Sequence, residues 1–252
     1  MDYAQSRLQA RFGELPDELL WRKLEAVAEP AAALEIAQSC GLRRWVVGIA
    51  PRADKHQIEL TLRAHWRECV AEIASWMPWS WQPALLWTRE LVDLPALVYL
   101  ARGAAPLPWM LDDPALQVYA RADSITRQTM LRDDCRAFMG STLEALDHAV
   151  LQARPGPSQI SQAWLIEWRR RWPGWSDTAA LENLARLFLA AMKQPALIGR
   201  PELARKLRSL FRRSVLDPVV AFIYIAFAAL DIERLRAGLL KHAMVQEGII
   251  PS

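Results

Sequence analysis

The sequence contains few cysteines, and none of them has the spacing of a metal or redox motif. Cys40, Cys69 and Cys135 are the only three in 252 residues. An odd number of widely separated cysteines argues against a disulfide framework and against a cysteine-based zinc site. This spacing indicates a reducing compartment such as the cytosol.

Glycine is also scarce, with 10 residues in the chain, and the glycine-rich loops that bind phosphate are missing. The sequence contains neither GxxxxGK[ST] nor GxGxxG, so it has no recognisable nucleotide-binding loop. The hydrolase motif GxSxG and the zinc-protease motif HExxH are absent as well. We therefore expect no catalytic, cofactor-binding or metal-binding residues, and we expect that the protein is not an enzyme.

Long hydrophobic runs are missing too. The longest, Val219–Leu230, has twelve residues, whereas a membrane-spanning helix needs about 20. This run is typical of a buried core helix. The N-terminal residues 1–15 lack the apolar segment of a signal peptide. We expect a cytoplasmic protein that reaches a membrane, if at all, through other proteins.

An excess of charge of one sign is also missing. The formal net charge is +3, and basic and acidic residues alternate along the chain. A dedicated nucleic-acid-binding protein usually concentrates its basic residues on one face. The charge pattern therefore disfavours nucleic acid as the main partner.

The sequence does have helical periodicity along most of its length. It is also rich in Ala, Leu and Arg, which favour helix. Apolar residues recur at steps of three and four over Asp54–Met77, which predicts a long amphipathic helix. The short run Trp45–Ile49 is the exception, because WVVGI is typical of a strand. We predict an all-α fold of several helices, arranged as repeat-derived lobes with little or no sheet. Further helices are expected over 17–28, 31–39, 114–139, 141–152, 158–172, 177–193, 201–213 and 217–246.

Tryptophan is unusually frequent, with twelve residues. Four of them lie in the stretch SWMPWSWQPALLW: Trp76, Trp79, Trp81 and Trp87. Indoles bury a large apolar body, so the favoured interpretation is packing between two helices. The alternative is an aromatic platform for bases or a ligand.

Two basic segments are candidate binding surfaces. Arg169–Arg171 lies among Trp164, Trp168 and Trp172, which form one helical stripe, so packing is favoured over stacking on bases. The segment RKLRSLFRR separates its apolar residues from a basic face. Such a face suits either solvent or an anionic partner. Its basic residues are Arg205, Lys206, Arg208, Arg212 and Arg213.

Other polar residues give weak signals. His65 flanks an apolar stripe, where a histidine with satisfied hydrogen bonds is commoner than a ligand. The acidic pair Asp133–Asp134 precedes Cys135 and suggests a metal corner. However, adjacent carboxylates on a helix point in different directions, so a solvated face is favoured.

A weak internal repeat relates two helical segments. LVDLPALVYLARG (Leu91–Gly103) aligns with ALDIERLRAGLLK (Ala229–Lys241), each with an acid near its start and a basic residue near its end. We expect each copy to be helical, with the acid at the start of the aligned segment. The residues that carry the repeat are Asp93, Leu97 and Arg102 in the first copy and Asp231, Leu235, Arg236 and Lys241 in the second.

This pattern resembles the family that comprises the d subunit of V-type ATPases and the C subunit of archaeal A-type ATPases. In that family a short basic helix and an Asp/Pro turn lead into a long helix with this signature, as in Leu207–His242. Tyr3–Ala26 resembles the opening of the family. The family's asparagine is replaced by Ala96 and Arg234, and two repeats are clear where the family has three.

The resemblance implies a non-catalytic coupling subunit that links the membrane rotor ring to the central shaft. Its partners would be the ring and shaft subunits, and it would lie in the cytoplasm, peripheral to the inner membrane. The alternatives are a helical protein–protein adaptor unrelated to ATPases and a single-stranded nucleic-acid binder. We expect one all-α domain over residues 1–252, or two lobes over 1–152 and 160–252 joined by the linker 153–159.

Overall fold

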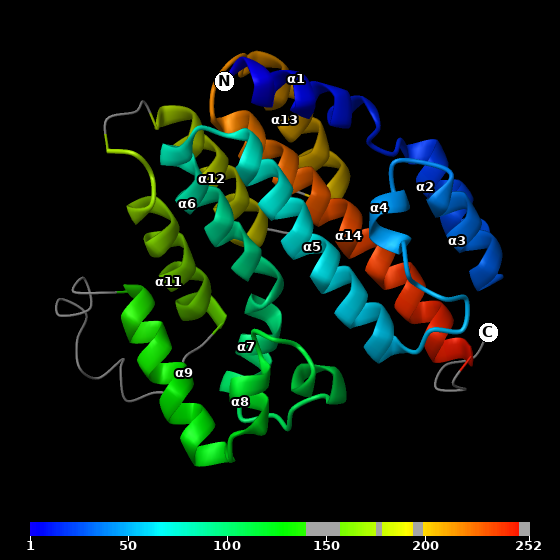
Figure 1. Ribbon diagram of the computed structural model, residues 1–252, viewed down its shortest axis with the longest axis vertical. Coiled ribbons are helices and arrows are strands. Elements are labelled where there is room, and N and C mark those ends of the chain that lie inside the picture. The colour runs from blue at the N-terminus through cyan, green and yellow to red at the C-terminus, as the bar shows by residue number, and fades with distance from the viewer. Residues whose placement is uncertain (140–156, 175–177, 194–198, 247–252) are drawn as a thin grey trace. The chain divides into compact units, whose positions relative to one another are not determined.

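A computed structural model describes residues 1–139, 157–174, 178–193 and 199–246, and these residues form helices joined by turns (Figure 1). No strand occurs in the described ranges. The prediction of an all-α fold is confirmed. The helix expected over residues 141–152 lies outside the described residues.

The chain divides into two compact units. Unit 1 comprises Met1–Leu85 and Pro173–Ser252, and unit 2 comprises Leu86–Trp172. Of the predicted linker 153–159, residues 153–156 lie outside the described ranges, and Pro157 already begins a helix.

Unit 1 is built around its last helix, α14 (Val219–Gln246). This helix packs against four other helices of the unit, and every residue of 219–228 is buried. The apolar run is therefore a core helix, as the sequence predicted. The other helices are α1 (Asp2–Gly13), α2 (Glu18–Ala26), α3 (Pro30–Gln38), α4 (Arg43–Val46), α5 (Lys55–Trp76), η1 (Trp79–Trp81), α12 (Ala179–Lys193) and α13 (Arg200–Arg213), with α6 (Gln82–Trp87) at the unit boundary.

The predicted helix starts in unit 1 are explained by local capping. The Asp54 carboxylate accepts hydrogen bonds from the backbone N–H groups of His56 and Gln57, so α5 begins one residue later. Asp17 caps α2 in the same way, by accepting from Leu20 N. An N-cap carboxylate satisfies amides that have no partner within the helix. The expected long helix over Asp54–Met77 is confirmed.

The prediction of a strand at Trp45–Ile49 is wrong. Residues Arg43–Val46 form the short helix α4, and the chain then turns at Gly48, where φ is +82°. A strand needs a partner for its backbone hydrogen bonds, and the described residues offer none. Trp45 and Val46 are instead buried against the helices around them.

Unit 2 contains shorter helices. The helix expected over residues 114–139 is interrupted, because the Asp123 carboxylate caps a new helix by accepting from Ile125 N and Thr126 N. Buried Arg127 closes the interruption by donating to the carbonyls of Tyr119 and Ala122. The elements are η2 (Thr88–Val92), α7 (Leu94–Ala101), η3 (Pro108–Leu111), α8 (Gln117–Arg121), α9 (Ser124–Met139) and α11 (Pro157–Arg170).

Candidate functional site

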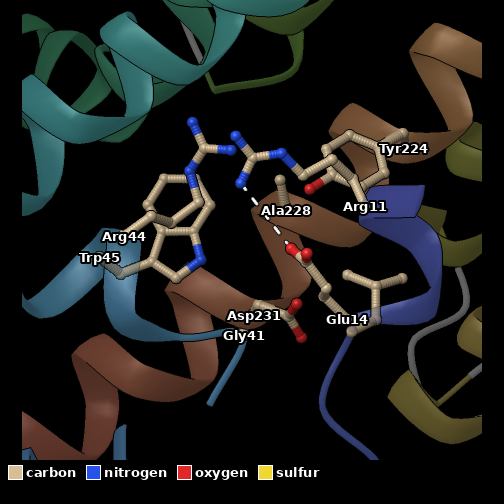
Figure 2. A pocket seen from close by; sticks show the side chains of 9 residues that line it. Arg11, Glu14, Gly41, Arg44, Trp45, Tyr224, Ala228 and Asp231 are labelled. Carbon is tan, nitrogen blue, oxygen red and sulfur yellow. Dashed lines mark ion pairs between the residues drawn. The ribbon is translucent and has the colours of Figure 1, made fainter. Parts of the chain in front are cut away.

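A small polar pocket lies in unit 1 between α1, α4 and α14 (Figure 2). Figure 2 shows the guanidinium groups of Arg11 and Arg44 on one side and the carboxylates of Glu14 and Asp231 on the other. Helix α14 contributes Asp231, and α4 contributes Arg44. The pocket has room for about one water molecule, so it does not accommodate a small organic substrate.

The two arginines of the pocket share one carboxylate on α5. Arg11 Nη2 lies 2.8 Å from Glu72 Oε1, and Arg44 Nη2 lies 2.8 Å from Glu72 Oε2. Burial works to raise the pKa of Glu72, but the hydrogen bonds and charges of Arg44 and Arg11 outweigh it and lower that pKa. This cluster joins α1, α4 and α5, which is a structural role.

Two potential nucleophiles near these arginines are held in their protonated forms. Burial raises the pKa of the Cys69 thiol to about 11, although Arg44 opposes this. Burial likewise raises the pKa of the Tyr224 hydroxyl to about 12. The thiolate is the reactive form of cysteine. At neutral pH neither group is therefore activated for nucleophilic or general-base chemistry.

Asp231 is a carboxyl group of the pocket whose surroundings strongly raise its pKa. Burial raises its pKa to about 7, against the opposing charges of Arg208 and Arg234. A carboxyl group with such a pKa can exchange a proton at physiological pH. In the described part of the chain, no three residues of the metal-binding types come together as a metal site.

The second copy of the sequence repeat lies within α14 and fastens this helix to its neighbours. Arg236 Nε donates to Glu59 of α5 across 2.6 Å. Arg234 donates to Glu18 and Glu25 of α2, and its guanidinium lies 4.8 Å from the centre of the Trp21 ring. Of the remaining motif residues, Leu235 is buried and Lys241 is exposed.

The first copy lies in unit 2 and has a different local structure. Asp93 is buried and immediately precedes α7, where its carbonyl accepts from Leu97 N. Arg102 is the exposed residue that ends α7. Both repeated segments are helical, as expected. Asp93 immediately precedes α7, whereas Asp231 lies inside α14, because the apolar run before it belongs to the same helix, as the helix expected over residues 217–246 implies.

The predicted basic segment is an amphipathic helix. Leu203, Leu207 and Phe211 of α13 are buried, and Phe211 stacks on Phe12 of α1 with ring centres 4.1 Å apart. Arg205 and Lys206 form ion pairs with Glu202 on the same helix. All five predicted basic residues, Arg205, Lys206, Arg208, Arg212 and Arg213, are exposed. The apolar and basic faces are thus separated as expected.

The tryptophans of the stretch Ser75–Trp87 have different environments. Trp81 is 3% exposed, and its ring lies 6.2 Å from that of Phe222 on α14. In unit 2, the Trp87 indole N–H donates to the Trp164 carbonyl. The packing interpretation therefore holds for these two. It does not hold for Trp79, which is 83% exposed.

The second tryptophan stripe packs within unit 2, as predicted. Trp164 and Trp168 stack with ring centres 5.7 Å apart, and Trp168 meets Trp172 edge to face at 4.8 Å. Arg171 lies 4.3 Å above the Trp87 ring and pairs with Glu167 at 2.8 Å. Arg171, one residue of the candidate nucleic-acid-binding surface, therefore already contacts side chains of unit 2.

The weaker candidates also have internal partners. His65 Nε2 lies 2.8 Å from the Val47 carbonyl, which agrees with a histidine whose hydrogen bonds are satisfied. Tyr119 donates its hydroxyl to the Asp134 carboxylate, and Asp133 is exposed. The side chain of Cys135 lies outside the described residues.

Sequence analysis did not identify the cluster of Arg11, Arg44 and Glu72. Its only trace in the sequence is that Glu72 follows Cys69 by three residues and therefore flanks the apolar stripe of α5. Amphipathic helices commonly carry charge at this position, so the pattern by itself does not single out Glu72.

Comparison of the chain with protein-family models, curated proteins and solved structures gave no match. In the described ranges, no helix combines the length and the apolarity needed to cross a bilayer. The resemblance to the rotary ATPase subunits therefore has no support from these comparisons and rests on the sequence motifs alone.

Proposed function

We propose that the protein is a non-catalytic coupling subunit of a V/A-type rotary ATPase that links the membrane rotor ring to the central shaft. The arrangement of Leu207–His242 carries this proposal. The resemblance implies a short basic helix, an Asp/Pro turn and a long helix, and these correspond to α13, Asp217–Pro218 and α14. The Asp217 carboxylate accepts from Val219 N across 2.8 Å and so fixes the start of α14.

The fastening of α14 supports a mechanical role. A subunit that transmits torque must resist deformation, and close packing gives protein interiors low compressibility. The first ten residues of α14 are buried. Farther along the helix, Arg234 and Arg236 hold it to α2 and α5 through ion pairs. Residues of the second repeat copy thus stiffen unit 1, one at a motif position (Arg236) and one at the position of the family's asparagine (Arg234).

The middle of the basic face on α13 is the surface that we assign to a partner subunit. The side chain of Arg205 is 75% exposed and that of Lys206 is 44% exposed. Both residues lie between the buried positions Leu203 and Leu207 of α13. Exposed cations of this kind steer an acidic partner and select its orientation. In this proposal the subunit lies at the cytoplasmic face, peripheral to the inner membrane.

Co-purification with the ring and shaft subunits tests the proposal. The chain is co-expressed with both subunits of a V/A-type ATPase, and its recovery through a tagged shaft subunit is measured. We expect the intact chain to be recovered and the double variant R205E/K206E to be recovered at least about tenfold less, because a rim charge contributes mainly to encounter and orientation. A chain that joins neither subunit overturns the proposal.

A matched control is available on α2. Arg22 and Lys23 are both exposed, and Arg22 faces Glu18 one turn away, as Lys206 faces Glu202. The variant R22E/K23E therefore makes the same change of charge on another helix of unit 1. It should be recovered like the intact chain, and equal losses for both variants would assign the effect to net charge alone.

A helical adaptor outside any ATPase is the second candidate, and the exposure of Trp79 favours it, since exposed indoles are frequent at protein contacts. The neighbouring genes distinguish the two candidates. Genes for ring and shaft subunits beside this one favour the coupling role, and their absence favours the adaptor.

A further inference from the structure

Four large apolar side chains are exposed at one end of unit 1. Their exposed fractions are 60% for Tyr3, 83% for Trp79, 65% for Val215 and 48% for Leu216. These values are high for apolar residues of this size, because transfer of such side chains out of water is favourable. We call this group, together with Arg7, Arg212 and Arg213, the corner patch.

Contacts between the helices bring the parts of the corner patch together. The Arg7 guanidinium lies 5.5 Å from the Tyr3 ring centre and 5.2 Å from that of Trp76, the last residue of α5. Trp79 follows within three residues. Figure 1 shows the start of α1, the end of α5 and the connection from α13 to α14 at the same end of unit 1.

The connection between α13 and α14 is fixed against α1. Leu216 N donates to the side-chain oxygen of Gln5 across 3.2 Å, and Gln5 is buried. Near the same place, Trp81 packs on Phe222, one turn into α14. The corner patch therefore surrounds the start of α14 and has a defined structure.

Leu216 has a φ of +59°, the left-handed region that favours glycine. For a leucine this conformation is strained, because it brings Cβ close to the following carbonyl oxygen. The hydrogen bond that Leu216 N donates to the Gln5 side chain holds the backbone in this conformation, and the side chains of both Val215 and Leu216 are exposed to solvent. A glycine at position 216 would relax the backbone but would remove one apolar group.

The charge of the corner patch is predominantly positive. Arg7, Arg212 and Arg213 are exposed, and the nearest exposed acid on α1 is Asp2. The other nearby acid, Asp217, directs its carboxylate to Val219 N at the start of α14. The corner patch therefore combines three cations and four apolar side chains, with two acids, Asp2 and Asp217, beside them.

We propose that the corner patch binds the surface of an anionic lipid bilayer. Tryptophan and tyrosine prefer the boundary between headgroups and acyl chains, and arginine pairs with lipid phosphates. Apolar insertion and basic attraction together supply the two contributions that stable peripheral binding requires. The proposal does not depend on the coupling role, because it concerns lipid and this chain alone.

The distribution of the apolar groups favours lipid over a partner helix. A groove or face that binds a helix presents anchors at helical spacing. Here Val215 and Leu216 lie in the connection between α13 and α14, Trp79 begins the three-residue helix η1, and Tyr3 lies near the start of α1. Side chains that project from short connecting segments beside arginines suit insertion into a deformable headgroup layer.

Flotation with lipid vesicles tests the proposal on the full chain. Vesicles of phosphatidylcholine alone are compared with vesicles that contain about 30% phosphatidylglycerol, which supply the negative surface potential that attracts basic residues. We expect binding to the anionic vesicles, little binding to the neutral ones, and release at about 0.5 M salt, where screening shortens the range of the attraction. Failure to float with anionic vesicles at low salt overturns the proposal.

Substitutions assign the binding to the corner patch. Trp79→Ser should weaken binding to anionic vesicles roughly tenfold, because it removes the largest inserting side chain. R212E/R213E should weaken binding by about tenfold or more, since each basic residue near the surface contributes. The control for Trp79→Ser is Leu19→Ser, because Leu19 is 75% exposed and lies on α2, outside the corner patch. The control for R212E/R213E is R22E/K23E, which makes the same change of charge on α2.

The outcomes separate this proposal from the coupling role. Circular dichroism first confirms that each variant is folded. If the controls lose as much binding as the variants of the corner patch, the patch is not the site and the proposal is wrong. If the chain binds vesicles but does not co-purify with the ring or shaft subunits, the lipid-binding proposal is supported and the coupling role is rejected.

Discussion

Glu59 and Arg236 form an ion pair that joins α5 to α14, with Arg236 Nε 2.6 Å from Glu59 Oε2. Glu59 is 5% exposed, and Arg63 on the same helix lies 3.7 Å from its other oxygen. A carboxylate at this depth is tolerated only when cations compensate for its lost hydration. The motif residue Arg236 thus compensates a buried charge in the core of unit 1.

The first prediction follows from this pair. Glu59→Ala should lower the free energy of unfolding by about 3–5 kcal/mol, because it takes a carboxylate from the buried Arg63 and from Arg236. Urea unfolding followed by circular dichroism measures the change. The control is Glu233→Ala, whose ion pair with Arg200 is more than half exposed at both side chains, and which should cost less than about 1 kcal/mol. Equal effects would contradict the structural role of Glu59.

The second prediction compares two neighbouring tryptophans. Trp81→Ala should destabilise unit 1 by about 3–5 kcal/mol, because it leaves a cavity beside Phe222. Trp79→Ala should change stability by no more than about 0.5 kcal/mol, since its ring is in solvent. Thermal unfolding of both variants measures the difference. A large loss with Trp79→Ala would show that this ring is packed.

The third prediction concerns the dependence of stability on pH. Burial raises the pKa of Asp231 from 3.8 to about 7 in the folded chain. Between these two values the folded state binds a proton that the unfolded state releases, so the contribution of Asp231 to stability falls as pH rises. Asp231→Asn should therefore be more stable than the intact chain at pH 8, by about 2–4 kcal/mol.

The pH profile distinguishes this titration from other effects. The charged and titratable groups around Asp231 are Arg208, Arg234 and the pocket residues Arg11, Glu14, Arg44 and Tyr224. Denaturant unfolding at intervals from pH 4 to pH 8 (roughly the range between the two pKa values) should show a gap between the two proteins that widens with pH. A constant gap would mean that the titration of Asp231 is not its cause.

The fourth prediction concerns cysteine reactivity. Cys69 is 0% exposed, and its pKa is raised to about 11, whereas Cys40 is partly exposed. Iodoacetamide should modify Cys40 in the folded protein at least about 100-fold faster than Cys69, because the thiolate is the reacting species and must be accessible. Peptide mass spectrometry measures both rates, and in urea they should converge. Rapid modification of Cys69 without urea would contradict its burial.

Local sequence patterns predicted most of the helices. The apolar stripe from Ile58 to Trp76 predicted α5 almost to the residue, and the Asp54 cap seen in the structure explains where this helix begins. Capping and periodicity act over one or two turns, so they can be read without knowledge of the fold. The buried run of α14 was predicted from composition, because its twelve consecutive apolar residues are too few to span a membrane and suit a core helix.

Local patterns failed where a distant segment decides the outcome. The run WVVGI has the composition of a strand, yet no partner strand exists among the described residues, and it became α4 and a turn. The two repeat copies look alike in sequence. However, Asp231 lies within a continuous helix, whereas Asp93 precedes one.

The sequence by itself determined that this chain is helical and that residues 219–228 are buried, because both properties follow from composition and short-range spacing. Only the tertiary structure decided that Glu72 joins two arginines and that Trp81 is buried while Trp79 is exposed. Ion pairs and exposure depend on which helices, distant in sequence, pack against one another. These contacts are set by the packing of the whole unit, so no single segment of sequence determines them.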